Sequence, residues 1–91
     1  MESQVLLEDI IGAKNKVKLL RLLIKNELIS FSEIRKKLGL NHSVLKEYLN
    51  TLEKAGIVRV YKVSRFRIYG LRKDNPKVRY LIKLFEVWDL S

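Results

Sequence analysis

Residues 39–58 read GLNHSVLKEYLNTLEKAGIV, and the spacing within this stretch decides the fold. Three leucines stand at positions i, i+4 and i+7, which share one face of a helix: Leu45, Leu49 and Leu52. Asn41 is a favourable N-cap for such a helix, and Gly56 lies where glycine commonly ends one. The pattern predicts an amphipathic helix over residues 42–55.

The residues just upstream predict a second, shorter helix. Ser30 and Glu33 fit the capping-box pattern, in which a hydroxyl and a glutamate three residues later satisfy free N–H groups at a helix start. This helix is expected to run from Glu33 to Leu38, with Gly39 as the left-handed residue after its end. Two short helices joined by a three-residue turn with glycine indicate a helix-turn-helix.

Downstream, the hydrophobic period changes from helical to alternating. Residues 57–63 and 66–71 are rich in β-branched and aromatic side chains, and they flank Ser64 and Arg65. This pattern predicts a two-stranded hairpin over about 57–71, which we call the wing. Three aromatic rings of these strands are expected to pack inward onto the helices: Tyr61, Phe66 and Tyr69.

Amphipathic segments flank this unit on both sides. From Lys14, apolar side chains recur at helical spacing with bases between them, which predicts a helix of about three turns. The apolar lead-in before Gly12 predicts a short helical turn, and residues 28–29 suffice only for a connecting strand. Pro76 is expected to begin a closing helix. Five apolar residues should form one face of this helix: Val78, Leu81, Ile82, Phe85 and Trp88.

These elements predict a mostly helical α+β fold, a winged helix-turn-helix with a two-stranded wing and a C-terminal amphipathic helix. The chain has 91 residues, which fits one domain. We expect residues 12–72 to form the helix-turn-helix core and the wing. The segments 1–11 and 75–91 carry more apolar surface than one core needs, because Leu84 and Val87 extend the face of the closing helix. They predict a homodimer formed through the terminal segments.

Composition excludes several classes of protein. The sequence has no cysteine and one histidine, so we expect no metal site and no cofactor. Residues 1–4 carry no cationic region ahead of an apolar stretch, and no apolar run approaches the ~20 residues of a membrane span. We therefore expect a cytoplasmic protein. No glycine-rich phosphate loop or catalytic triad pattern is present, so we expect no enzyme.

The positive charge is large and unevenly placed. Nineteen Lys and Arg against ten Asp and Glu give a formal net charge of +9. Residues 13–26 hold five bases and no acid, and residues 57–73 hold six bases and no acid. Such concentration within two segments repels itself unless an acidic partner neutralises it, and nucleic acid is the partner this pattern favours.

The face of helix 42–55 opposite the leucines carries side chains that can hydrogen-bond base edges and phosphates. They are His42, Ser43, Lys46, Glu47 and Asn50. Taken alone, this face could equally be an ordinary solvated surface. The basic hairpin favours the nucleic-acid interpretation, with three wing residues expected on the DNA backbone or in the adjacent minor groove: Lys62, Arg65 and Arg67.

The run 39–58 resembles the recognition helix of ArsR- and MarR-like winged helix regulators. Residues 14–23 are similar to the first core helix of that family, and residues 67–71 resemble the returning wing strand. The closing segment from Asn75 looks like that of small archaeal-type members. The resemblance implies that helix 42–55 reads the major groove of double-stranded DNA and that the wing contacts the backbone or minor groove.

The sequence therefore predicts a sequence-specific, double-stranded DNA-binding transcriptional regulator. Two other functions stay open, a winged helix module for protein–protein assembly and an RNA-binding module. An assembly module would not need a basic hairpin together with a basic first helix. RNA binding would be favoured by exposed rings on an open sheet, whereas the rings of this hairpin are expected to pack inward.

Overall fold

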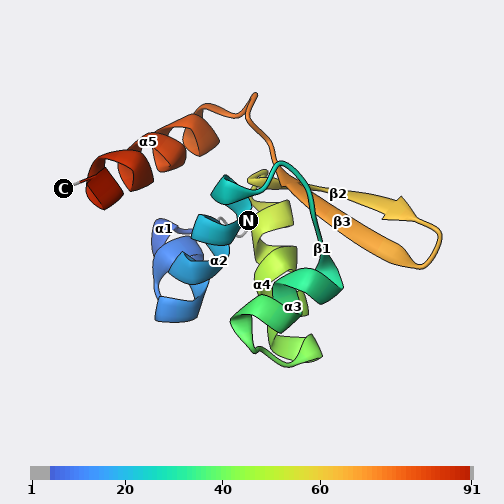
Figure 1. Ribbon diagram of the computed structural model, residues 1–91. Helices are drawn as coiled ribbons and strands as arrows, with labels where there is room; N and C mark the ends of the chain where they lie inside the picture. Colours follow the sequence, from blue (N-terminus) through green and yellow to red (C-terminus); the bar gives the residue numbers. More distant parts are fainter. Residues whose placement is uncertain (1–4, 91) are drawn as a thin grey trace, which may run out of the picture.

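The computed structural model describes residues 5–90; residues 1–4, on which the expected absence of a secretion signal rests, and Ser91 lie outside this range. The elements are α1 (Leu7–Ile11), α2 (Lys14–Lys25), β1 (Ile29–Ser30), α3 (Phe31–Leu38), α4 (His42–Lys54), β2 (Val58–Val63), β3 (Phe66–Leu71) and α5 (Pro76–Leu90). Figure 1 shows the hairpin projecting from the helical body on one side, with α5 at the opposite end. The predicted fold class is confirmed.

Local capping sets the start of α3. The Ser30 hydroxyl accepts a hydrogen bond from the Glu33 backbone N–H at 3.2 Å. Because Ser30 is the N-cap, the helix begins at Phe31, and the predicted start at Glu33 was two residues late. At the other end Gly39 adopts a left-handed φ of 67°, as the sequence predicted.

The second helix of the motif is capped in the same manner. The Asn41 side-chain oxygen accepts a hydrogen bond from the Val44 N–H at 2.9 Å. Helix α4 ends at Lys54, one residue before the predicted end at Ala55, which serves as the C-cap. Gly56 follows with a φ of 77° and turns the chain into β2.

The sheet has three antiparallel strands in the order β1-β3-β2. The short segment expected as a connecting strand pairs with β3, since Ile29 lies opposite Tyr69 and Ser30 opposite Ile68. Strands β2 and β3 form the predicted hairpin, closed by the two-residue turn Ser64–Arg65. The sheet is therefore anchored to the helices at one end, and the hairpin extends beyond β1.

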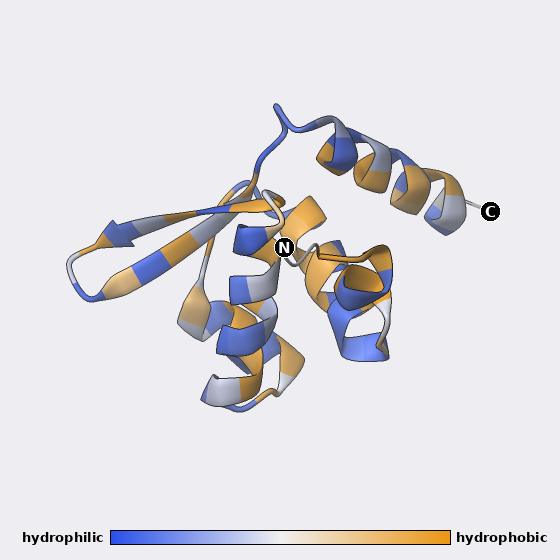
Figure 2. Cartoon of the chain, turned by 180° about the vertical axis from the view of Figure 1, so that it is seen from behind, coloured by the Kyte–Doolittle hydropathy of each residue, from blue (hydrophilic) through white to orange (hydrophobic). Residues whose placement is uncertain are grey.

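The prediction that all three hairpin rings pack inward was wrong for two of them. Tyr69 is 3% exposed, but Tyr61 is 43% and Phe66 is 62% exposed. Successive residues of a strand point to opposite faces, so residues 66 and 69, an odd number apart, cannot both face the helices. Tyr61 pairs with Ile68 on the same outer face as Phe66. In Figure 2 the hairpin accordingly alternates between apolar and polar bands.

One apolar core joins the helices to the sheet. Its fully buried members include Leu19, Leu20, Leu23, Ile34, Leu45, Leu49, Val58 and Val78. Helix α5 contributes Val78 and Phe85, but Trp88 is 72% exposed, so the apolar face predicted for this helix is buried only in part. No helix among residues 5–90 combines the length and the apolar character that crossing a bilayer requires.

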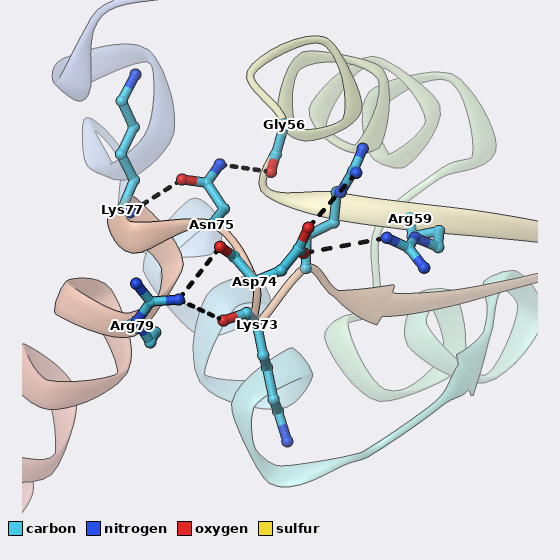
Figure 3. Close-up of polar contacts among 8 residues, drawn as sticks. Gly56, Arg59, Lys73, Asp74, Asn75, Lys77 and Arg79 are labelled. Atoms are coloured by element: carbon cyan, nitrogen blue, oxygen red, sulfur yellow. Dashed lines mark hydrogen bonds and ion pairs between the residues drawn. The ribbon is translucent and has the colours of Figure 1, made fainter.

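A side-chain bracket connects the end of the helix-turn-helix to α5 (Figure 3). The Asn75 amide nitrogen donates to the Gly56 carbonyl at 2.8 Å, and the Asn75 amide oxygen accepts from the Lys77 N–H at 3.0 Å. The Arg79 guanidinium donates to the carbonyls of Lys73 and Asp74. The start of α5 is thereby tied to the turn that follows α4.

Candidate nucleic-acid interface

The five polar residues predicted on α4 are all exposed, while the leucine stripe on its other side is buried. Ser43, Glu47 and Asn50 line one shallow hollow of about 430 Å³, together with Lys46 and Lys54. This arrangement follows from the helical period, because the buried stripe leaves the opposite side of the helix to solvent. The predicted face is thus presented as one continuous polar surface.

His42 lies at the beginning of this surface, and its position is fixed by a contact. Its ring packs against the Phe31 ring with centroids 4.9 Å apart and planes tilted by 50°. Phe31 in turn lies 6.5 Å from the ring of buried Tyr69. The aromatic series links the first residue of α4 to the core of the sheet and orients the imidazole at the start of the helix.

A cavity of about 320 Å³ lies between the starts of α3 and α4 and the wing. We call it the wing cavity; it is lined by Ser30, Phe31, Ser32, His42, Lys46, Arg65, Phe66 and Arg67. Strand β1 ends at Ser30, opposite Ile68, so the edge of β3 beyond that point is not covered by β1. The cavity occupies the space along this edge.

The wing cavity brings together four of the eight predicted site residues from three elements. His42 and Lys46 come from α4, Arg65 from the hairpin turn, and Arg67 from β3. Sequence reasoning missed the two serines, Phe31 and Phe66 as members of this site. The alternation along β3 was an available signal only that the Phe66 ring does not pack against the helices with Tyr69.

Acids from outside the hairpin compensate part of its charge. Asp74 lies 4.0 Å from Arg59 and 3.9 Å from Arg72, as Figure 3 shows for Arg59, and Glu27 lies 3.1 Å from Lys73. Three of the six bases of residues 57–73 are therefore paired with acids from outside this segment. Among residues 5–90, the structure gives no ion pair to the three predicted wing residues: Lys62, Arg65 and Arg67. The uncompensated charge lies in the distal half of the wing.

Arg67 faces both the core and the wing cavity. Burial raises the pKa of the Tyr69 phenol, and the adjacent Arg67 guanidinium acts in the opposite direction. The half-buried Arg67 shares the inner sheet face with Tyr69, since the two lie two residues apart. Arg67 therefore lies on the side of the sheet that faces the helices, and it lines the wing cavity with His42 and Lys46.

Comparison with known proteins identifies the fold. The model of the winged helix-turn-helix DNA-binding family matches residues 13–59. HlyU from Vibrio cholerae has a TM-score of 0.79 and 25% identity, with 96% of this chain and 90% of that chain covered. The transcriptional regulator HlyU from Vibrio vulnificus has a TM-score of 0.74 and 27% identity, with coverage of 92% and 83%.

A third structure extends the comparison to lower identity. The homodimeric winged helix-turn-helix DNA-binding domain Mb0332 from Mycobacterium bovis, a possible ArsR-family regulator, has a TM-score of 0.71 at 19% identity, with 88% of this chain and 71% of that chain covered. No curated protein sequence matches this chain. The family match spans the helix-turn-helix and the beginning of the wing, and it confirms the predicted resemblance to winged helix regulators, while the likeness to archaeal-type members stays a prediction. The chain belongs to the winged helix-turn-helix DNA-binding family.

Proposed function

We propose that this protein is a sequence-specific, double-stranded DNA-binding transcriptional regulator in which α4 reads the major groove. The wing would contact the backbone or the adjacent minor groove. The observation that carries this proposal is the single surface that joins the exposed polar face of α4 to the uncompensated cations of the distal wing. The similar transcriptional regulator HlyU supports the regulatory part of the proposal.

The chemistry of α4 suits base recognition. Asn50 can bond adenine through both atoms of its amide, and Lys46 can bond the guanine acceptors. Both side chains are exposed on a helix whose diameter fits the major groove. The wing cations carry no sequence information by themselves, because phosphate contacts fix register and orientation.

A competition experiment tests the nucleic-acid class. A labelled duplex, selected by the protein from a random pool, is competed at one salt concentration with the same duplex, either single strand and the matching RNA duplex. We expect the DNA duplex to compete best. Because Tyr61 and Phe66 are exposed, RNA or single strands have rings available for stacking, and equal or better competition by either would overturn the proposal.

We also propose that the protein forms a homodimer through α1 and α5. Four exposed apolar residues of α5 recur at i, i+4, i+7 and i+8: Tyr80, Leu84, Val87 and Trp88. Next to them, a groove of about 370 Å³ is lined mostly by apolar side chains of α1 and α5, including Leu7 and Leu81. A second copy presents the same apolar surface, as a two-fold interface requires. The similar domain Mb0332 is homodimeric, which supports a second copy of this chain as the partner of the apolar surface.

Sedimentation tests the dimer. The intact protein is expected to sediment as a dimer at tens of micromolar, and Leu84→Lys is expected to produce a monomer because it places a charge in the apolar surface. Lys83→Glu, on a neighbouring exposed position of the same helix, serves as the matched control. A monomeric intact protein, or a Leu84→Lys variant that stays fully dimeric, would contradict this interface.

A further inference from the structure

We infer that the wing cavity is the seat of one DNA backbone phosphodiester, a contact distinct from base reading by α4 and from the wing's general attraction to DNA. This inference rests on the proposed DNA-binding function and specifies the path of one strand. A duplex read by α4 in its major groove and touched by the wing in the next minor groove has a sugar–phosphate backbone between those grooves. The wing cavity lies between those same two elements.

The charges around the wing cavity suit a phosphate anion. Lys46 approaches from α4, Arg65 from the hairpin turn and Arg67 from β3, and none of the lining residues is acidic. Arginine presents a planar fork that bonds two phosphate oxygens at once. An anion in the wing cavity would therefore be approached by a cation from α4 on one side and by cations from the wing on the other.

The neutral side chains of the wing cavity fit the rest of a backbone unit. The hydroxyl oxygens of Ser30 and Ser32 lie 3.4 Å apart, and Ser30 already accepts the Glu33 N–H. One of the two hydroxyl hydrogens is used in the contact between the serines, and the other can still be donated to a phosphate oxygen. Phe31, at the start of α3, supplies an apolar part of the lining against which a deoxyribose can pack.

The size of the wing cavity agrees with this occupant. Its volume of about 320 Å³ equals the space of about ten water molecules in the liquid, which accommodates a phosphodiester and an attached sugar. The ring contact between His42 and Phe31 fixes the positions of these two lining residues of the wing cavity in the absence of DNA. We therefore expect the cavity to act as a preformed seat.

Replacing single phosphates by uncharged methylphosphonates tests the inference. Each backbone position of the selected duplex is neutralised in turn, and the affinity of the wild-type protein is measured for every duplex. We expect one phosphate in each half-site at which neutralisation weakens binding at least about tenfold, the loss of one charge-assisted hydrogen bond. When that phosphate is neutralised, the affinity of the Arg67→Gln variant should fall less than threefold, because the charged partner of the phosphate is already missing.

Two further variants make the result independent of folding. Arg65→Gln changes an exposed turn residue and should show the same loss of sensitivity, whereas Arg59→Gln, at the base of the same hairpin beside Asp74, should keep the wild-type profile. If neutralisation costs are spread evenly along the backbone, or if the sensitive phosphate stays equally sensitive in both Arg67→Gln and Arg65→Gln, the inference is overturned. Failure of the proposed function would show differently, as no preference for duplex DNA.

Discussion

Gly39 ends α3 in a conformation that ordinary residues adopt at a cost. Its φ is 67°, and a Cβ built on it would meet no heavy atom within 4 Å. The effect of Gly39→Ala is therefore purely conformational, and we expect the free energy of unfolding to fall by about 1 kcal/mol. Urea denaturation would measure it, with Gly39→Asn as a milder control because asparagine tolerates this region. An alanine variant as stable as wild type would contradict this argument.

Individual residues of the interface should separate base reading from backbone attraction. Lys46→Ala and Asn50→Ala are expected to cost about 1–3 kcal/mol on the selected duplex and much less on random duplex. Arg65→Ala should weaken binding to both duplexes alike, because phosphate contacts are the same for every sequence. Anisotropy titrations with the two duplexes provide the measurement. Equal losses on both duplexes for all three variants would remove α4 as the reading element.

At the scale of single residues, the sequence predicts the role of a side chain well when the physical cause of that role is local. Ser30, Asn41 and Gly39 act on the N–H and C=O groups of their own helix ends, so their roles were evident before the fold was known. Phe66 was misplaced although the alternation along its own strand separates it from Tyr69, whereas the exposure of Trp88 depends on how α5 packs against the rest of the fold. The capping side chains need no such information.

The Asn75 bracket is the contact that sets α5 relative to α4. Asn75→Asp keeps an acceptor for the Lys77 N–H but removes the donor to the Gly56 carbonyl, and Asn75→Ala removes both bonds. We expect each variant to lower the free energy of unfolding by about 1–3 kcal/mol, since the half-buried Asn75 is one of the few polar links between these elements. Thermal and urea denaturation would measure the loss, and an unchanged stability in both variants would refute the bracket.

A surface ion pair fastens the far end of α5 to α2. Arg21 and Asp89 form two hydrogen bonds, of 2.7 and 3.0 Å, and the Arg21 guanidinium lowers the pKa of the Asp89 carboxyl. A carboxyl whose pKa is lowered by folding stabilises the protein above its unfolded pKa of about 4 and loses that contribution as the pH falls through the lowered value.

The lowered pKa of Asp89 determines how the stability of an Asp89→Asn variant should depend on pH. At neutral pH the variant is expected to be slightly less stable than wild type, and the difference should shrink to zero as the pH falls well below 4. Parallel thermal melts across this range would measure it. A difference that is constant with pH, or larger in acid, would show that the ion pair is not its cause.

At the scale of helices and strands, the sequence does not reveal which distant segments pair with one another. The two residues of β1 carry too little pattern to indicate a partner, yet they pair with β3 and thereby define the edge of the wing cavity. Glu27 and Asp74 likewise approach the base of the wing from outside the basic segment. The individual helices and the hairpin were predictable because their hydrophobic periods lie within single stretches.

The wing and α5 lie on opposite sides of the molecule (Figures 1 and 2), and the surfaces on these two sides differ chemically. One end carries α4 and the basic wing, and the other carries the apolar surfaces of α1 and α5 with the acids Glu8 and Asp9. If two copies meet through the apolar end, their α4 helices point outward and should enter successive major grooves about 34 Å apart. We expect hydroxyl-radical footprints to show two protected half-sites with that spacing, and a single protected half-site would contradict the dimeric arrangement.

The salt dependence of duplex binding tests the central claim most directly. Three cations of the wing carry the backbone contacts of the proposed interface: Lys62, Arg65 and Arg67. At about 0.9 per neutralised phosphate, a plot of log affinity against log salt should have a slope of about −2.7 for one protomer and about −5.4 for a dimer. Arg65→Gln should reduce the magnitude by about 0.9 per protomer. A nearly flat plot for the wild-type protein would contradict the account.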